Sequence, residues 1–284
     1  MESALGLPAP AKLNLFLHVT GRRADGYHTL QTVFQLIDLA DWLDFERRDD
    51  GRIVREGDLP WNEANDLPVR AATALKEATG CRLGASVRVT KNIPPGSGMG
   101  GGSSDAATTL LALNRLWGLR LPRSDLAAIA LPLGADVPFF LHGGNAFADG
   151  VGEQLQDVVT PAAWYAVVWP QVHVSTREIF ADSGLTRNTK PTKIADFSAA
   201  AGHLPSTLVG VNDLEPVARR RFPDIEQALG ALEHHGPARM TGSGSAVFAP
   251  MATESQARTA VAECLPKWQR WAVRGLNEHP HCAW

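Results

Sequence analysis

Apolar and polar residues alternate along segment 11–19, AKLNLFLHV, near the start of the chain. The alternation places the apolar residues on one face of an extended strand, because successive strand side chains point to opposite sides. These residues are Ala11, Leu13, Leu15, Leu17 and Val19. Lys12 and Asn14 then share the opposite face. The pattern therefore predicts a β-strand that carries a cation and an amide side by side.

A second alternating segment leads into a run of glycines and then into helical periodicity. Segment 85–93, ASVRVTKNI, predicts a strand with Lys91 on its apolar side, between Val89 and Ile93. Beyond the glycines, apolar residues recur on one helical face, namely Ala106, Leu110, Leu113 and Trp117. The stretch SSD at 103–105 stands where this helix would begin, and we expect it to supply the N-cap.

The glycine-rich loop, PPGSGMGGG at 94–102, joins the predicted strand to the predicted helix. Glycine has no Cβ, so its backbone N–H groups can lie directly against a ligand. The first turn of a helix adds free N–H groups and the positive end of the helix dipole. We therefore expect the loop to bind an anion, most naturally a phosphate chain. A flexible linker would also be rich in glycine, but it would not be joined directly to a strand and a helix.

Three common phosphate-binding patterns do not fit this loop. Gly96, Gly98 and Gly101 have the spacing of a dinucleotide fingerprint, but no acidic residue at a strand end follows about 20 residues later. A Walker loop needs a lysine after its last glycine, where this chain has Ser103. A protein-kinase loop would be accompanied by HRD and DFG motifs, which the sequence lacks. A dinucleotide-dependent oxidoreductase stays open only as a weak alternative.

Composition narrows the class of protein. The chain has 284 residues, 20% charged residues and a formal net charge of −3, so nothing favours binding to nucleic acid or to an anionic membrane. It has neither the N-terminal pattern of a secretion signal nor an apolar run long enough to span a membrane, and we expect a cytoplasmic protein. Its three cysteines lie far apart and no HExxH motif is present, so we expect neither a disulfide nor a protein metal site.

The two halves of the chain differ in pattern. The first alternates strand-like and helix-like segments, whereas WYAVVWP at 164–170 begins a new strand-like region. We place a domain boundary here, with an N-terminal domain of residues 1–157 and a C-terminal domain of residues 158–284. A second glycine motif, TGSGS at 241–245, predicts either a loop over a ligand or a turn between strands. The last eight residues, NEHPHCAW, show no periodicity and predict a tail.

Several segments together resemble the GHMP family of small-molecule kinases. The stretch PPGSGMGGGSSDAA resembles the loop with which that family wraps the triphosphate of ATP without a Walker lysine. Met99 stands where leucine is usual in that loop, and Ser97 where glycine is common. Further segments resemble family counterparts in the same order, namely AKLNLFLHVTGRRADGYHTLQTVFQLIDLAD (11–41), LGADVPFFLHGG (133–144), VNDLEP (211–216) and MTGSGSAVFA (240–249). The resemblance thus covers nearly the whole chain.

This resemblance implies an α+β fold of two domains, S5-like and then ferredoxin-like, with the active site in the cleft between them. It implies ATP as co-substrate, with Mg²⁺ carried mainly by the ATP phosphates and no protein ligand assigned to the metal. Lys12 and Asp136 match the catalytic pair of the family. Asp136 would take the proton from the acceptor hydroxyl, and Lys12 would stabilise the carboxylate and the attacking oxygen. Considered alone, Lys12 would more often be a surface lysine and Asp136 a cap or turn residue.

The resemblance also implies the binding residues. The ATP site would comprise Asn65, Lys91, Pro94, Pro95, Gly96, Ser97, Gly98, Met99, Gly100, Gly101, Gly102, Ser103 and Ser104. The acceptor would be a methylerythritol joined through a diphosphate to cytidine, phosphorylated on its 2-hydroxyl in non-mevalonate isoprenoid precursor synthesis. Tyr27 and Phe180 would enclose the cytosine ring and His28 would read its edge. Asn14 and Thr176 would contact the methylerythritol. Core packing for Phe180 and a hairpin turn for DGYH at 25–28 are the structural alternatives.

Two other functions remain open from the sequence. Another GHMP kinase would act on homoserine, mevalonate or a sugar and would not depend on cytidine. A non-catalytic nucleotide-binding protein would keep the glycine loop and lose the acceptor chemistry, although the presence of both Lys12 and Asp136 argues against it. In either case we expect small-molecule ligands, no nucleic-acid or membrane partner, and a monomer or a weak homodimer.

Overall fold

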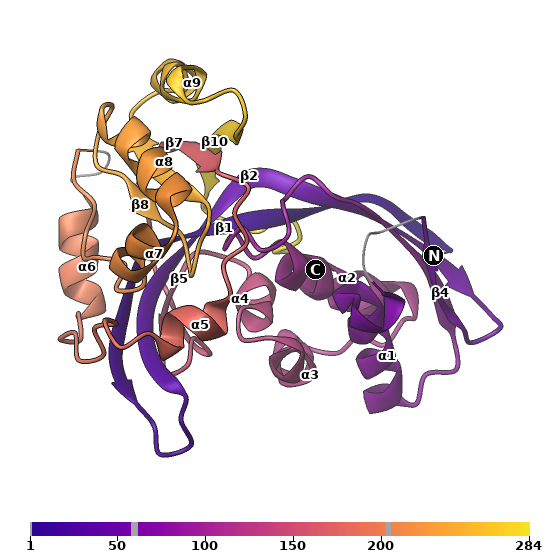
Figure 1. The fold of residues 1–284 in the computed structure, drawn as a ribbon. Helices are drawn as coiled ribbons and strands as arrows, with labels where there is room; N and C mark the ends of the chain where they lie inside the picture. The colour runs from indigo at the N-terminus through magenta and orange to yellow at the C-terminus, as the bar shows by residue number, and fades with distance from the viewer. Residues whose placement is uncertain (1, 58–61, 203–205) are drawn as a thin grey trace.

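The computed structural model describes residues 2–57, 62–202 and 206–284. Two long antiparallel strands, β1 (Ser3–Arg22) and β2 (His28–Arg48), form its centre. Figure 1 shows this ribbon arching from the helices of the N-terminal half to α5 (Thr176–Ala181). The strand predicted for 11–19 is confirmed as part of β1. Both of its faces are covered, so Lys12 and Asn14 are buried like their apolar neighbours.

The N-terminal part of the sheet grows from β2. Strand β4 (Gly84–Thr90) pairs antiparallel with β2, and β3 (Ile53–Glu56) pairs parallel with β4. Strand β5 (Ala146–Asp149) also pairs with β2, and β6 (Gln154–Asp157) with β5. Among the described residues, four α-helices cover one face of this sheet, namely α1 (Leu67–Thr79), α2 (Gly101–Leu116), α3 (Arg123–Ala130) and α4 (Val137–His142) (Figure 1). A short 3₁₀ turn at Glu63–Asn65 precedes α1, and another at Leu131–Leu133 joins α3 to α4.

Helix α2 forms the centre of the N-terminal core. The apolar face predicted from the sequence is buried as expected, with Ala106, Leu110 and Leu113 fully enclosed. Leu110 and its neighbours pack with residues of β2, α1 and α4 in one apolar cluster. Because α2 is fixed on several sides, the glycine loop at its N-terminus is held against the sheet.

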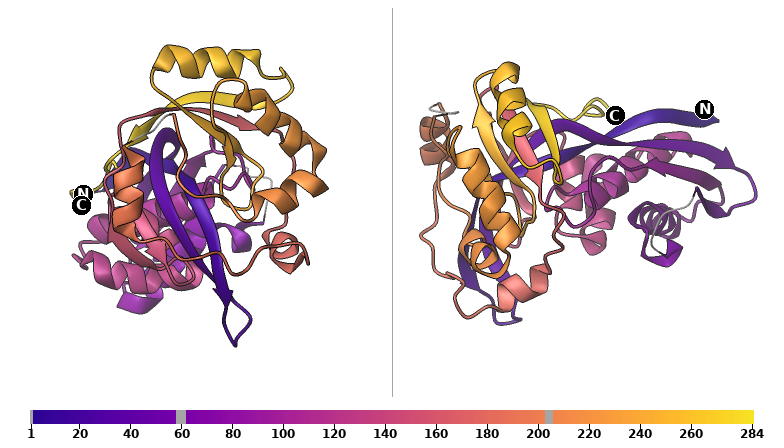
Figure 2. Two further views of the ribbon diagram at one scale, coloured as in Figure 1. Left: turned by 90° about the vertical axis from the view of Figure 1, so that its left-hand side faces the viewer. Right: turned by 45° about the horizontal axis from the view of Figure 1, so that its top comes forward.

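The C-terminal half builds a second set of strands on the edge of the first. Strand β10 (Gln269–Leu276) pairs with β7 (Trp164–Trp169), and its last residues pair with Ile37 and Leu36 of β2. Strands β9 (Val247–Met251) and β8 (Arg239–Met240) complete the order β3-β4-β2-β10-β7-β9-β8. The helices of this half are α5, α6 (Ile194–Ala201), α7 (Glu215–Arg221), α8 (Pro223–Glu233) and α9 (Glu254–Glu263). Figure 2 shows α8 and α9 lying against these strands.

The predicted domain boundary coincides with the end of β6 at Asp157. Strand β10 then returns from the C-terminal half to β2, so the two halves share one continuous sheet. The division at residue 157 therefore stays a prediction. Among the residues that the structure describes, no helix is both long enough and apolar enough to cross a membrane.

The predicted cap of α2 is wrong. The N-cap is Gly100, whose φ of 75° lies in the left-handed region that glycine adopts without strain. The stretch 103–105 lies within the first turns of the helix and provides no side-chain cap. Gly100 takes this position because the loop turns sharply there, and a Cβ would lie 3.0 Å from the ring of Phe140.

The prediction of a C-terminal tail is also wrong, because the last eight residues pack on the N-terminal half. His279 is 1% exposed and His281 is 4% exposed. Arg123 of α3 donates hydrogen bonds to the carbonyl oxygens of His281, at 2.7 Å, and Cys282, at 2.9 Å. The segment has no periodicity because a partner far away in sequence holds its backbone, and this arrangement does not require a repeating side-chain pattern.

Candidate active site

A cleft of about 1120 Å³ lies between the glycine loop, the tip of the β1–β2 ribbon, α5 and the second glycine motif. The structure brings most of the predicted site residues to it. These are Lys12, Asn14, Tyr27, His28, Asn65, Lys91, Pro94, Pro95, Gly96, Ser97, Gly98, Gly100, Gly101, Gly102, Ser103, Asp136, Thr176 and Phe180. Residues from both halves of the chain thus meet in one cavity, which is large enough for two small-molecule substrates.

Met99 and Ser104 are the two predicted residues that are not among those lining the cleft. The side chain of Met99 is fully buried in the core, and its carbonyl oxygen accepts a hydrogen bond from the backbone N–H of Lys12 at 3.0 Å. Ser104 is fully buried within the first turn of α2. The hydrogen bond between Lys12 and Met99 joins the glycine loop to β1, next to the lysine side chain that lines the cleft.

The glycine loop is closely packed against the second glycine motif as well as open to the cleft. A Cβ on Gly98 would lie 2.3 Å from the carbonyl oxygen of Thr241 and 3.1 Å from that of Gly244. The backbone N–H of Ala246 also donates to the carbonyl oxygen of Ser97 at 2.9 Å. At Gly98 the absent side chain therefore makes room for protein backbone, whereas the sequence had suggested room for a ligand alone.

Lys12 and Asp136 face each other in the cleft. The Nζ atom of Lys12 lies 3.4 Å from Oδ2 of Asp136 and donates to Oδ1 of Asn14 at 2.5 Å. Lys12 is only 3% exposed, while Asp136 is 34% exposed. Asp136 occupies the N-cap position of α4 but makes no side-chain cap hydrogen bond there, so its carboxylate is not committed to the helix. The pair combines a buried cation with a carboxylate that a substrate can reach.

Asn14 connects this pair to the second glycine motif. Its backbone N–H donates to Oγ1 of Thr241 at 2.9 Å, and that hydroxyl donates to Oδ1 of Asn14 at 3.2 Å. Its side-chain Nδ2 donates to Oγ1 of Thr32 at 2.9 Å. The Asn14 amide therefore orients Lys12 through hydrogen bonds to both halves of the chain.

Lys91 belongs to a buried ionic cluster that sequence reasoning missed. Its Nζ atom pairs with the carboxylates of Asp41 and, at 2.7 Å, Asp105. Asp41 also accepts hydrogen bonds from the backbone N–H groups of Asn92, at 2.6 Å, and Ile93, at 2.8 Å. Burial lowers the pKa of Lys91, but the two carboxylates outweigh this effect and raise its pKa overall. The cluster therefore fixes the residues just before the glycine loop and keeps Lys91 charged.

The position of Asp105, one helical turn after the last glycine, was a local signal that could have suggested a partner for Lys91. Asp41 offered no comparable signal, because it lies 50 residues before Lys91 in the sequence. Burial raises the pKa of Asp105, and the positive charge of Lys91 opposes that rise. The two carboxylates can share one lysine because Asp41 is also neutralised in part by the backbone donors.

Aromatic side chains gather at the other end of the cleft. The rings of His28 and Phe180 are stacked, with centroids 4.9 Å apart and an interplanar angle of 25°. Tyr27 is 67% exposed at the tip of the ribbon. Burial, followed by the positive charges of Arg187 and Arg22, lowers the pKa of His28. Thr176, the first residue of α5, shares a hydrogen bond of 2.7 Å with the hydroxyl of Ser243. This end offers flat apolar faces beside a neutral imidazole.

The cleft presents few protein ligands for a metal. Within the described residues, no group of three or more His, Cys, Asp or Glu side chains is placed to hold a metal ion. The oxygen-bearing side chains that line the cavity at the glycine loop and at the starts of α2 and α4 include those of Ser97, Ser103, Asp105 and Asp136. The Asp105 carboxylate is already paired with Lys91.

Comparison with known proteins identifies the family. Residues 66–144 match the GHMP kinases N terminal domain, and residues 195–268 match the GHMP kinases C terminal family. The chain is 54% identical over 278 residues to 4-diphosphocytidyl-2-C-methyl-D-erythritol kinase from Aromatoleum aromaticum, covering 98% of this chain and 95% of the relative. It is 56% identical over 274 residues to the protein of the same name from Thiobacillus denitrificans, covering 96% of each chain.

Solved structures agree with the sequence relatives. A crystal structure of 4-(cytidine 5'-diphospho)-2C-methyl-D-erythritol kinase matches with a TM-score of 0.84 at 35% identity, over 97% of this chain and 100% of that chain. Homoserine kinase from Cytophaga hutchinsonii matches with a TM-score of 0.71 at 17% identity, over 98% and 96% of the two chains, and shares the fold alone. The predicted α+β, two-domain architecture is confirmed. The chain belongs to the GHMP kinase family and, within it, to the 4-diphosphocytidyl-2-C-methyl-D-erythritol kinases.

Proposed function

We propose that the chain is an ATP-dependent kinase that phosphorylates the 2-hydroxyl of 4-diphosphocytidyl-2-C-methyl-D-erythritol, giving the 2-phosphate and ADP. The reaction is a step of non-mevalonate isoprenoid precursor synthesis. One structural observation carries the chemistry, namely that Lys12 Nζ lies 3.4 Å from Asp136 Oδ2 in the cleft that the glycine loop also lines. The relatives at more than half identity over nearly the full length supply the substrate.

The acceptor hydroxyl would lie between Asp136 and the γ-phosphate of ATP. Asp136 takes the hydroxyl proton as the new oxygen–phosphorus bond forms and the bond from the γ-phosphorus to the ADP oxygen breaks. Lys12, oriented by Asn14, stabilises the negative charge on the attacking oxygen. Phosphoryl transfer depends mainly on positioning and charge, so a carboxylate, an ammonium group and a phosphate-binding loop are sufficient protein machinery.

The glycine loop and the N-terminus of α2 would bind the ATP phosphates through backbone N–H groups. Lys91 and Asn65 would lie near the adenosine, at the end of the cleft that leads to the buried ionic cluster. Mg²⁺, when bound, would neutralise charge on the transferred phosphate. It prefers oxygen ligands, and the Ser103 hydroxyl would complete a coordination supplied mainly by phosphates and water.

The cytidine would bind at the aromatic end of the cleft, with Tyr27 and Phe180 against the faces of the ring and His28 at its edge. Asn14 and Thr176 would contact the methylerythritol. This placement is supported by the stacked pair His28 and Phe180 in the same cavity as Lys12. A base that stacks and also pairs its polar edge is selected strongly, because a mismatched base would leave buried polar groups unpaired.

The test is ADP release by the purified protein with Mg-ATP and a panel of acceptors. The panel contains 4-diphosphocytidyl-2-C-methyl-D-erythritol, methylerythritol phosphate without cytidine, homoserine and mevalonate. We expect turnover with the first acceptor alone. Turnover with homoserine or mevalonate would keep the kinase chemistry and overturn the substrate. ATP binding without turnover on any acceptor would instead indicate a non-catalytic nucleotide-binding protein.

A further inference from the structure

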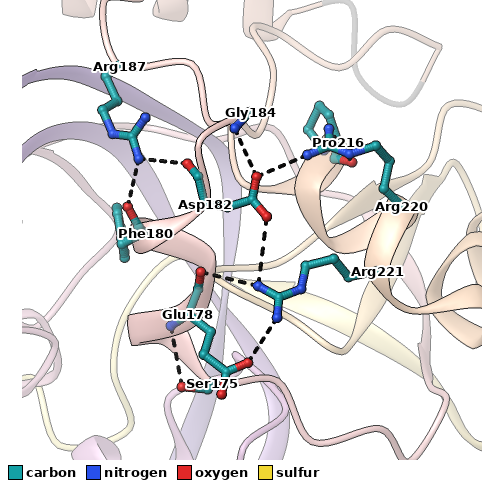
Figure 3. A network of polar contacts seen from close by, with 9 residues as sticks. All are labelled: Ser175, Glu178, Phe180, Asp182, Gly184, Arg187, Pro216, Arg220 and Arg221. Atoms are coloured by element: carbon teal, nitrogen blue, oxygen red, sulfur yellow. Dashed lines mark hydrogen bonds and ion pairs between the residues drawn. The ribbon is translucent and has the colours of Figure 1, made fainter.

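A single arginine joins the two aromatic residues at the far end of the cleft. Arg187 lies in the segment after α5, and its Nε atom donates a hydrogen bond to Nε2 of His28 at 3.3 Å. Its guanidinium group also donates to the carbonyl oxygens of Phe180, at 2.9 Å, and Asp182, at 2.7 Å, as Figure 3 shows. A further bond of 3.1 Å reaches the carbonyl oxygen of Leu185. One side chain thus fixes the end of α5 relative to the β1–β2 ribbon.

The contact with His28 determines which ring nitrogen carries the proton. The guanidinium group of an arginine can only donate hydrogen bonds. Nε2 of His28 must therefore accept, and the neutral ring carries its proton on Nδ1. A ring in this tautomer can donate a hydrogen bond from Nδ1 to an acceptor on a ligand. Cytosine offers such an acceptor at N3, where uracil carries a hydrogen, whereas the O2 atom accepts in both bases.

A second set of contacts holds α5 from the opposite side. Arg221, at the end of α7, pairs with Glu178 at 3.2 Å and with Asp182 at 3.8 Å, and Arg220 pairs with Asp182 at 3.2 Å (Figure 3). These pairs are partly exposed and none of the contacts described for them reaches His28. Arg221 therefore provides a matched control, because it is an arginine that anchors the same helix without contacting the imidazole.

We propose that Arg187 is a positioning residue for recognition of the base, which it achieves by fixing the tautomer of His28 and the placement of Phe180. This inference rests on the proposed function, since it assumes that a cytosine base binds against these two rings. Arg187 is not among the residues that line the cleft, so we expect its loss to change acceptor binding and base selectivity and to leave the chemical step unchanged.

The charges around His28 favour the same neutral tautomer. Arg187 on one side and Arg22 of β1 on the other both oppose a positive charge on the ring, in addition to the effect of burial. The nearby carboxylate of Asp25 is paired with Arg23 at 2.8 Å and accepts from the backbone N–H of Tyr27. Loss of Arg187 removes one of the two cations and the fixed acceptor role of Nε2 together.

The first experiment compares Arg187→Met with Arg221→Met in steady-state kinetics. In Arg187→Met we expect KM for the cytidine-linked acceptor to rise roughly 3- to 10-fold, as for the loss of one hydrogen bond, with KM for ATP and kcat nearly unchanged. We expect the preference for the cytidine-linked acceptor over its uridine-linked analogue to fall by a similar factor. In Arg221→Met, which loses partly exposed ion pairs and one hydrogen bond to the carbonyl oxygen of Glu178, these parameters should change less than about two-fold.

Arg187→Lys refines the comparison, because lysine keeps the charge but lacks the planar group that reaches His28 and three carbonyl oxygens together. We expect it to restore only part of the acceptor affinity. Unchanged acceptor KM and base preference in Arg187→Met would overturn the proposal. Equal effects of Arg187→Met and Arg221→Met would also overturn it, because they would indicate a general anchoring of α5.

The second experiment does not require activity. Long-range ¹H–¹⁵N correlation spectra of the unmodified protein, with His28 assigned by comparison with His28→Gln, report which ring nitrogen is protonated. We expect a protonated Nδ1 and an unprotonated Nε2, and a proton on Nε2 would overturn the inference. If the unmodified protein fails to phosphorylate the cytidine-linked acceptor, the proposed function is wrong, and this spectrum still tests the bond from Arg187 to His28.

Discussion

Gly98 lies so close to Thr241 that a Cβ on the glycine would be 2.3 Å from the threonine carbonyl oxygen. The two residues belong to the two glycine motifs, one from each half of the chain. Their contact brings the glycine loop against the C-terminal half beside the cleft, which residues of both motifs line. Because the neighbour is backbone, it cannot move aside as a flexible side chain could.

Gly98→Ala should therefore displace one glycine motif from the other. Gly98 also has a φ of 80°, which disfavours any residue with a Cβ. We expect turnover to fall at least 10-fold, since small displacements of a catalytic arrangement are costly, and KM for ATP to rise. Gly118→Ala is the control, because Gly118 has a similar φ of 69° and nothing within 4 Å of the Cβ position. It should lose about 1 kcal/mol of stability to backbone strain and keep its kinetic parameters.

Asp136→Asn should separate chemistry from binding. The substitution keeps the size of the side chain and removes the group that accepts the proton, so we expect kcat to fall by roughly 10²–10⁴ and both KM values to change only a few-fold. Steady-state kinetics with ATP and the acceptor measure both effects. Asp125→Asn, an exposed aspartate in the first turn of α3, is the matched control and should leave activity unchanged. Near-normal kcat in Asp136→Asn would exclude the carboxylate as the base.

Asp41→Asn should loosen the residues that lead into the glycine loop. Asp41 is completely buried and holds Lys91 as well as the backbone of Asn92 and Ile93. Asparagine cannot supply the negative charge, and Lys91 would keep only Asp105, so we expect a loss of roughly 1–3 kcal/mol in unfolding free energy. We also expect a higher KM for ATP, because Lys91 and the loop entrance would be less well held. Urea unfolding and ATP kinetics measure the two effects.

The control for that variant is Asp38→Asn on the same strand. Asp38 is exposed, and its Oδ1 accepts a hydrogen bond from the backbone N–H of Arg274 at 2.8 Å, which asparagine can retain. Its unfolding free energy should change by less than about 0.5 kcal/mol. If the two variants were equally stable, the buried cluster would not contribute to the stability of the fold.

The packed C-terminal segment should make stability sensitive to acid. Burial, together with the charges of His281 and Arg123, lowers the pKa of His279 to about 3. In the unfolded chain the same ring takes up a proton near its ordinary pKa of about 6.5. Protonation then favours the unfolded state, so the stability is fully present above about pH 6.5 and is lost as the pH falls from there towards 3.

His279→Gln should reduce this acid sensitivity. Between pH 7.5 and 5.5 we expect the native protein to lose about 1 kcal/mol of unfolding free energy through this histidine alone, and the variant to lose less. Urea unfolding at the two pH values gives the difference. His234→Gln, at an exposed histidine, should leave the pH dependence unchanged. An unaltered acid response in His279→Gln would show that His279 does not titrate on unfolding.

Local patterns in the sequence were enough to predict the central elements. The period of two at 11–19 predicted the strand with Lys12 and Asn14, and the helical period from Ala106 to Trp117 predicted α2, because burial against one core selects these repeats. The run of glycines marked the loop between the strand and the helix, because glycine allows the sharp backbone turns that such a loop needs. The resemblance carried by these segments then placed Asp136, whose own short segment has no distinctive pattern.

Only the tertiary structure decided which distant residues meet. Lys91 and Asp41 are separated by 50 residues, and Arg123 and His281 by 158, yet both pairs are buried or partly buried contacts. Such contacts leave no periodic pattern in the sequence, because they depend on how the chain folds back on itself and not on any repeat along it. The sequence by itself therefore determined the strand, the glycine loop and the helix that follows it. The fold alone decided the ionic cluster behind the loop, the contact between Gly98 and Thr241, and the packing of the last residues.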